Sequence, residues 1–97
     1  MPMDEVPVFE YAVEPLRGRT RWRWELWDGP TLAAAGWHVT SRHAEIAVRT
    51  AAAARAHERL GLRVLRPALK RAVAASGGRG SRVELGSVGC ELVARAA

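Results

Sequence analysis

The segment from Thr20 to Gly29 restricts the fold of this chain more than any other stretch. It holds three of the four tryptophans and alternates apolar with charged residues as far as Leu26. A period of two is typical of a β-strand with one buried face. We therefore predict a strand whose apolar face joins a core and whose charged face points the other way. The two faces are Trp22, Trp24 and Leu26, and Arg21, Arg23 and Glu25.

A hairpin is expected directly after this strand. Asp28 and Gly29 are residue types that tolerate the positive φ of a tight turn. A two-residue turn at this point places Trp24 opposite Ala33, a large side chain beside a small one. The register stays open, because Pro30 is able to lengthen the loop.

The other elements follow from similar patterns. They are strands over residues 8–13, 32–39 and 83–85, a long helix over 42–60, and a shorter helix from Pro67 to about Ser76. Thr40 or Ser41 is the expected N-cap of the long helix, and Gly61 is its expected end. Residues 62–65 fit a short strand or a linker, and residues 91–97 fit a strand or a last helical turn.

On a helical wheel, the long helix has one charged side and one mostly small, apolar side. The predicted solvated side is Arg42, Glu45, Arg49, Arg55 and Arg59. The predicted inner side is His43, Ile46, Ala47, Thr50, Ala51, Ala54 and His57. Small inner residues allow the helix to lie close above the bulky tryptophans of the sheet.

These elements predict the α+β class: a three-stranded antiparallel sheet with a long helix packed across it, plus a second short helix and a C-terminal strand. The length of 97 residues fits a single domain. Within it we expect a loose N-terminus over 1–6, a sheet-plus-helix core over 7–60 and a C-terminal extension over 61–97.

The charge balance points to a polyanionic partner. The formal net charge is +5, and Lys70 is the one lysine among many arginines. Such a balance favours nucleic acid as a partner. A genome rich in guanine and cytosine gives the same composition without any nucleic-acid role, and composition alone does not separate the two interpretations.

The positive charge is concentrated between residues 55 and 82, where eight basic residues are opposed by Glu58 alone. We predict DNA or RNA binding there, assisted by the outer face of the tryptophan strand. The predicted contact residues are Arg63, Arg66, Lys70, Arg71, Arg79, Arg82, Arg21 and Arg23. Trp27 is predicted to stack on a base or to lie in a dimer interface. A solvated charged face, or docking between the acidic and basic ends of two copies, remains an alternative.

The residues for catalysis are not assembled in this sequence. Cys90 is the single cysteine, and His38, His43 and His57 do not have the spacing of metal ligands. We therefore predict no enzyme activity, no metal, no cofactor and no small-molecule substrate. No apolar run approaches the ~20 residues of a membrane span, and the acidic start lacks the features of a signal peptide. A cytoplasmic location is expected.

Several motifs in the first half resemble the YegP-like family of small uncharacterised proteins. They are the run Arg21–Gly29, then Ala35-Gly36, then Thr40-Ser41-Arg42 with an alanine-rich helix. The resemblance covers about residues 20–55 and implies a three-stranded antiparallel sheet with one helix across it, often in a tandem pair or dimer. A looser similarity to arm-type DNA-binding domains of tyrosine integrases implies DNA contact through the sheet. Neither implies a catalytic residue.

Two functions are consistent with these observations. The first is a small non-catalytic basic module that binds nucleic acid through its arginine-rich surface. The second is a homodimeric interaction or scaffold module that uses an open edge or face of the sheet.

Overall fold

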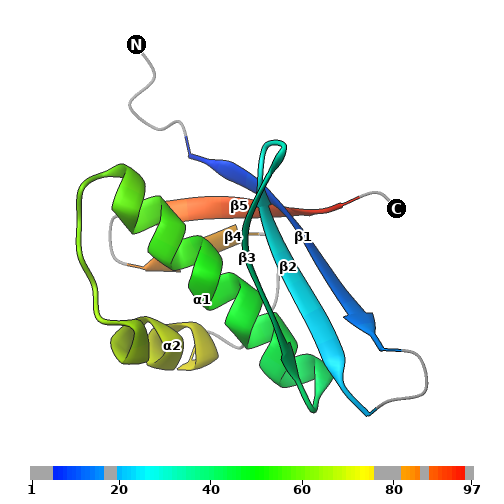
Figure 1. Cartoon of the computed structure of the whole chain (residues 1–97). Coiled ribbons are helices and arrows are strands. Elements are labelled where there is room, and N and C mark those ends of the chain that lie inside the picture. Colours follow the sequence, from blue (N-terminus) through cyan, green and yellow to red (C-terminus); the bar gives the residue numbers. More distant parts are fainter. Residues whose placement is uncertain (1–5, 17–19, 76–81, 86–87, 96–97) are drawn as a thin grey trace.

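A computed structural model of the chain describes residues 6–16, 20–75, 82–85 and 88–95. The described chain forms a β-sheet with a long helix lying across one face and a shorter helix beside the first (Figure 1). The elements are β1 (Val8–Pro15), β2 (Trp22–Asp28), β3 (Thr31–His38), α1 (Ser41–Arg59), α2 (Arg66–Ala75), β4 (Arg82–Leu85) and β5 (Val88–Ala94). The predicted α+β class is confirmed.

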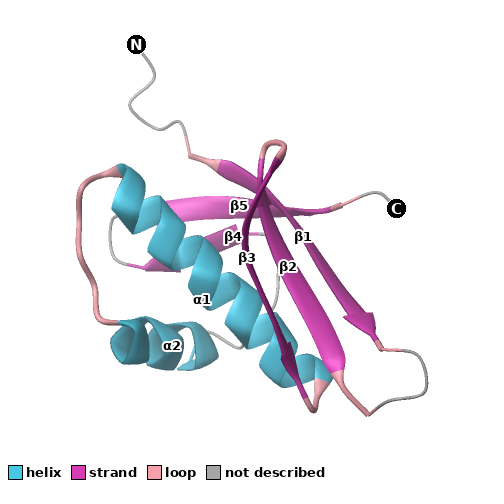
Figure 2. Cartoon of the chain, viewed as in Figure 1, coloured by secondary structure: helices cyan, strands magenta, loops and turns pink. Residues whose placement is uncertain are grey.

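The sheet has five strands in the order β3-β2-β1-β5-β4. The predicted three-stranded sheet therefore had too few strands. β1, β2 and β3 pair antiparallel as expected. β5 lies parallel to β1 and antiparallel to β4. A parallel partner requires a long connection, and the chain between β1 and β5 contains β2, β3, both helices and β4 (Figure 2). The glycines at positions 86 and 89 interrupt the alternation of apolar and polar residues, so the sequence did not predict β5 with its observed bounds. The buried residues of β5 are Val88, Cys90 and Leu92.

The β2–β3 hairpin forms, but in a different register from the one predicted. Asp28 pairs with Thr31, so the turn consists of Gly29 and Pro30, and Gly29 has a φ of 60°. A register shift between Leu26 and Trp27 then moves the strands by one more position. The expected pairing with Ala33 is therefore wrong.

Trp24 instead lies opposite Gly36, and Trp22 lies opposite His38. A Cβ atom added to Gly36 would lie 2.8 Å from Nε1 of Trp24. Glycine is therefore needed where the indole crosses β3, which preserves the expected combination of a large residue beside a small one.

The core lies between the sheet and α1. Trp24, Leu26 and Phe9 are buried, and Trp22 packs partly buried against them. The predicted core face of β2 is confirmed. Because α1 contributes mainly alanines, it lies close above these large side chains and contacts every strand of the sheet.

Both ends of α1 have the predicted signals. Thr40 is the N-cap, and its Oγ1 accepts a hydrogen bond from the His43 amide at 3.1 Å. At the other end Gly61 has a φ of 72°, and the Leu62 amide donates to the carbonyl of His57. This is the Schellman arrangement that satisfies the last carbonyl groups of a helix.

The predicted solvated side of α1 was wrong at Arg49. This residue is only 5% exposed, forms an ion pair with Glu45, and places its guanidinium 5.9 Å from the centre of the Tyr11 ring. The helical wheel did not predict this, because the sheet buries a wider arc of α1 than one stripe and Arg49 lies beside Tyr11 of β1.

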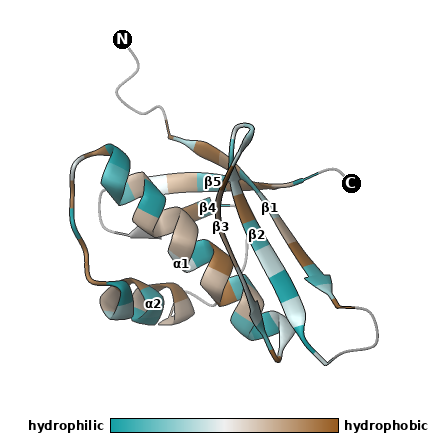
Figure 3. Cartoon of the chain, in the orientation of Figure 1, coloured by the Kyte–Doolittle hydropathy of each residue, from teal (hydrophilic) through white to brown (hydrophobic). Residues whose placement is uncertain are grey.

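The opposite face of the sheet is not covered by either of the described helices (Figure 2). It carries Trp27, whose ring lies 3.9 Å from the Arg95 guanidinium, and Trp37, which is 54% exposed. β3 forms one edge of the sheet, and Figure 3 shows that it is mainly hydrophobic.

Candidate nucleic-acid interface

The helix α2 is held on the rest of the fold by two apolar residues on one side. Leu69 and Val73 are one helical turn apart and almost fully buried, and α2 contacts α1 and β4. Burying each side chain stabilises the contact by about 1.5–3 kcal/mol. This anchoring directs Arg66, Lys70 and Arg71 to solvent, where all three are exposed.

We call these three residues, with Arg63 of the preceding linker, the α2 basic surface. No hydrogen bond or ion pair joins any of the four to a carboxylate among the described residues. Nor does the first turn of α2 contain an acidic residue. Arg66 and Lys70 have the i, i+4 spacing at which like charges destabilise a helix. The positive charge is therefore not neutralised within the described fold.

Six other arginines of the described chain are neutralised by carboxylates. The pairs are Arg23–Glu25, Arg49–Glu45, Arg55–Asp28, Arg59–Asp28, Arg82–Glu91 and Arg95–Glu10. The two hydrogen bonds to Asp28 measure 3.1 Å from Arg55 and 2.6 Å from Arg59. Burial tends to raise the pKa of Asp28, but these bonds outweigh it and keep the pKa below its usual 3.8.

Lys70 of the α2 basic surface acts on the end of the sheet where β3 stops. His38 is the last residue of β3, and its pKa is lowered by burial first and then by the charges of Lys70 and His43. The His38 and His43 rings lie 6.2 Å apart. Arg21 and Arg42 flank this end of the sheet and are exposed.

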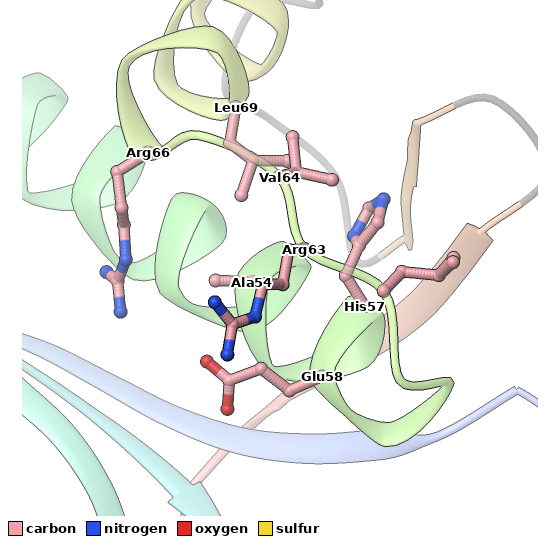
Figure 4. Close-up of a pocket in the computed structure, with 8 residues that line it drawn as sticks. Ala54, His57, Glu58, Arg63, Val64, Arg66 and Leu69 are labelled. Carbon is pink, nitrogen blue, oxygen red and sulfur yellow. The ribbon is translucent and has the colours of Figure 1, made fainter.

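A cavity of about 110 Å³ lies where the linker joins α1 to α2. Its lining residues are Ala54, His57, Glu58, Leu62, Arg63, Val64, Arg66 and Leu69. Figure 4 shows Arg63 reaching from the linker toward α1 and Glu58, with Arg66 beside it at the start of α2. Four of these residues are apolar, and the other four are polar or charged.

The predicted contact residues divide into two groups. Arg63, Arg66, Lys70 and Arg71 belong to one continuous stretch, and Arg21 is exposed without an ion pair among the described residues. Arg23 and Arg82 are instead engaged, Arg23 with Glu25 at 3.1 Å and Arg82 with Glu91 at 3.6 Å. Arg79 lies outside the described residues.

Trp27, the predicted stacking or interface residue, is partly covered within the chain. Its Nε1 donates to Oε1 of Glu25 at 3.2 Å, and Arg95 lies over its ring. The hydrogen bond from Trp27 is the main reason that the pKa of Glu25 is lowered; burial opposes it, and Arg23 adds to it. Trp37 is the more accessible tryptophan on this face.

The sequence interpretation missed His38, His43 and Arg42 as part of this region. All three lie close to the N-cap of α1, where β3 ends and the helix begins. A signal was present, since basic residues on both sides of a strand-to-helix turn are brought to one end of the sheet.

The described part of the chain also shows how the potential metal ligands, Cys90 and the two helices are placed. No group of three potential metal ligands occurs among the residues described. Cys90 is buried, which raises the pKa of its thiol to about 11 and keeps it protonated. In the described segments, neither helix combines the length and the apolar character needed to cross a membrane.

Comparisons of this chain with protein-family models, with curated proteins and with solved structures found no match. The similarity to the YegP-like family and to integrase arm domains therefore stays a prediction.

Proposed function

We propose that this protein is a non-catalytic module that binds the phosphate backbone of nucleic acid through the α2 basic surface. The observation that carries the proposal is the unneutralised charge of Arg63, Arg66, Lys70 and Arg71 in a fold that pairs six of its other arginines with carboxylates. Guanidinium and ammonium groups on an exposed helix fit phosphate oxygens.

The geometry supports backbone contact rather than reading of bases. The cations project from one helix and its linker, and Lys70 also acts on His38 at the end of β3. Phosphate contacts position a protein on nucleic acid without selecting a sequence. Binding is therefore expected to be salt-dependent and weakly selective among sequences.

The proposal is tested by fluorescence titration of the protein with duplex DNA, single-stranded DNA and RNA, at several salt concentrations. We expect binding at low salt that weakens linearly on a log–log plot against salt. An absence of binding to all three at low salt would contradict the proposal, because that condition favours phosphate contacts most.

A homodimer formed through β3 is the second candidate function, and the two edges of the sheet favour it. β4 has four residues and includes the charged Arg82, whereas β3 has eight residues and no charge. Trp37 and Leu32 of β3 are 54% and 43% exposed. Long uncharged edges tend to pair with another strand, and charges on an edge prevent this.

Sedimentation of the wild type and of Ala35→Lys tests this candidate, with Ala94→Lys of the inner strand β5 as the matched control. Dimerisation through β3 predicts a dimer that only the Ala35 variant converts to a monomer. A monomeric wild type at high protein concentration would exclude it.

A further inference from the structure

We infer that Trp37 stacks on an unpaired base, which makes a single strand the preferred form of the nucleic-acid partner. This inference deepens the proposed function and rests on it for the class of ligand. The α2 basic surface neutralises phosphates of the strand, and Trp37 contacts a base of the same strand at the end of β3.

Trp37 is the most accessible of the four tryptophans, all of which lie in the described residues. Its side chain is on the face of the sheet that neither described helix covers, and it is 54% exposed. Nε1 of its indole has no hydrogen-bond partner among the described residues. A large flat apolar surface therefore stays in contact with water, where another flat group is able to cover it.

The two sides of the Trp37 ring have different surroundings. Arg23 lies directly opposite Trp37 in the β2–β3 pair, and its guanidinium is 5.7 Å from the centre of the ring. An ion pair of 3.1 Å with Glu25 holds Arg23 in this place. Because β3 is the edge strand, no further strand of the described sheet covers the other side of the ring. One side is therefore supported, and the other is open to a base.

Trp27, on the same face of the sheet, is already covered within the chain. Its Nε1 donates to Glu25 at 3.2 Å, and the guanidinium of Arg95 lies 3.9 Å from the centre of its ring. Its strand β2 also has a neighbour on each side, β1 and β3. These contacts occupy Trp27 and leave Trp37 as the stacking residue.

Cations near the end of β3 give this region the charge that a polyanion requires. Lys70 of α2 is close enough to His38, the residue after Trp37, to contribute to lowering the pKa of His38. Arg21 directly precedes β2, and Arg42 lies in the first turn of α1, which contains no acidic residue. Both arginines are exposed and have no carboxylate partner among the described residues. They extend the positive charge of α2 toward the strand end that carries Trp37.

The carboxylates of the open face direct a bound strand along the edge of the sheet. Glu10 and Glu14 are on β1, which is separated from the edge strand β3 by β2. Glu10 is paired with Arg95 at 2.8 Å, and Glu14 lies opposite Arg23 across the β1–β2 pair. Phosphates avoid this acidic strand, so the path beside β3 is favoured. Only a single strand offers unpaired bases for stacking along such a path.

The test compares three labelled ligands by fluorescence anisotropy: oligo(dT) of about 15 nucleotides, an abasic oligomer with the same number of phosphates, and a duplex of the same length. We expect Trp37→Leu to weaken oligo(dT) about tenfold and to leave the other two ligands unchanged. Trp37→Phe keeps an aromatic ring and should retain most of the affinity. A parallel titration with oligo(rU) compares RNA with DNA as the source of the base.

Leu32→Ala is the matched control, because it removes another exposed apolar side chain from the same strand and should leave all three affinities unchanged. Intrinsic fluorescence gives a second measurement. Stacking on Trp37 should quench the emission of the wild type when oligo(dT) is added, and Trp37→Phe should lose most of this quenching. A change in the emission that is equal in the wild type and Trp37→Phe would contradict the inference.

The outcomes separate the inference from the proposed function. If the wild type binds DNA and Trp37→Leu weakens oligo(dT) no more than the abasic oligomer, the stacking is wrong and the proposed function stands. If Trp37→Leu weakens oligo(dT) alone but replacing Arg66, Lys70 and Arg71 by Gln weakens no ligand, the stacking stands and the proposed function is wrong. If no ligand binds at low salt, both are wrong. A dimer that Trp37→Leu converts to a monomer, with no quenching by oligo(dT), would assign Trp37 to contact with a second copy and overturn the inference.

Discussion

Two pairs of cations in this protein have the same spacing on a helix and opposite surroundings. Arg55 and Arg59 on α1 share the carboxylate of Asp28, which reaches them from the β2–β3 turn. Arg66 and Lys70 on α2 have no such partner among the described residues. Positive charge in a sequence therefore becomes a candidate site only when the fold leaves it without a carboxylate. The proposed function depends on this difference.

The largest effect is expected when cations of the α2 basic surface and cations paired with carboxylates are removed in two variants of equal net charge. Arg66→Gln, Lys70→Gln and Arg71→Gln together take the net charge from +5 to +2, as do Arg55→Gln, Arg59→Gln and Arg82→Gln. We expect the α2 triple variant to bind duplex DNA roughly tenfold or more weakly at low salt. The other triple variant should be weakened much less, as measured by fluorescence anisotropy. Equal weakening of the two variants would mean that only net charge matters.

Leu65 offers a change that moves stability and binding in opposite directions. The carbonyl of Leu65 accepts from the amides of Ala68 and Leu69, so Leu65 occupies the N-cap position of α2, where its apolar side chain cannot accept a hydrogen bond. Leu65→Asp supplies a capping side chain and is expected to raise the free energy of unfolding by about 1 kcal/mol. Its charge should also weaken nucleic-acid binding at the start of α2. Leu65→Asn is the matched control, because it caps the helix without a charge. Urea unfolding and anisotropy should show that both variants are stabilised and only Leu65→Asp binds more weakly.

Removing the carboxylate from the paired cations tests the other side of the comparison. Asp28→Asn should lower the free energy of unfolding by about 1 kcal/mol near neutral pH, since its two partners are partly exposed. The folded pKa of Asp28 lies below 3.8, so this contribution is present above pH 3.8 and is lost as the pH falls through the folded value.

Urea unfolding at about pH 7 and about pH 3 measures the difference. Glu58→Gln is the control, because Glu58 has no ion pair among the described residues. A destabilisation that stayed constant down to low pH would show that the carboxylate charge of Asp28 is not responsible. Asp28→Asn also leaves Arg55 and Arg59 without their carboxylate partner. A modest gain in DNA affinity is therefore expected if cations without a carboxylate partner bind DNA.

The smallest effect concerns Lys70 alone. Lys70→Gln removes the like-charge repulsion with Arg66 and should stabilise the protein by about 0.3 kcal/mol. It should also raise the pKa of His38, although burial continues to lower it. An NMR titration of the His38 ring measures the change. Arg71→Gln should leave this pKa where it is, and an equal shift in both variants would contradict the placement of Lys70.

Much of the fold could be predicted because its signals are local. The alternation of Trp22, Trp24 and Leu26 marks a buried strand face, and Thr40 and Gly61 mark the ends of α1. The hairpin register could not be predicted, because it depends on which residues close the turn and on a bulge beside Leu26. The parallel pairing of β5 with β1 depends on contacts between distant parts of the chain.

The candidate site shows the same limit. The sequence identified the cluster of cations at 63–71, but it gave Arg23 and Arg82 equal standing with them. Only the pairing of strands brings Glu91 beside Arg82, and the Glu25 partner of Arg23 required side-chain positions. Local sequence supplies the charges, and tertiary structure decides which of them are neutralised.

The most direct test of the central claim is the salt dependence of duplex DNA binding by the wild type and the α2 triple variant. The slope of log affinity against log salt becomes shallower by about 0.9 for each phosphate that the protein no longer neutralises. We predict a clear linear dependence for the wild type and a shallower slope for the variant, by the number of phosphates that Arg66, Lys70 and Arg71 bind. Identical slopes, or no binding by the wild type at low salt, would contradict the account.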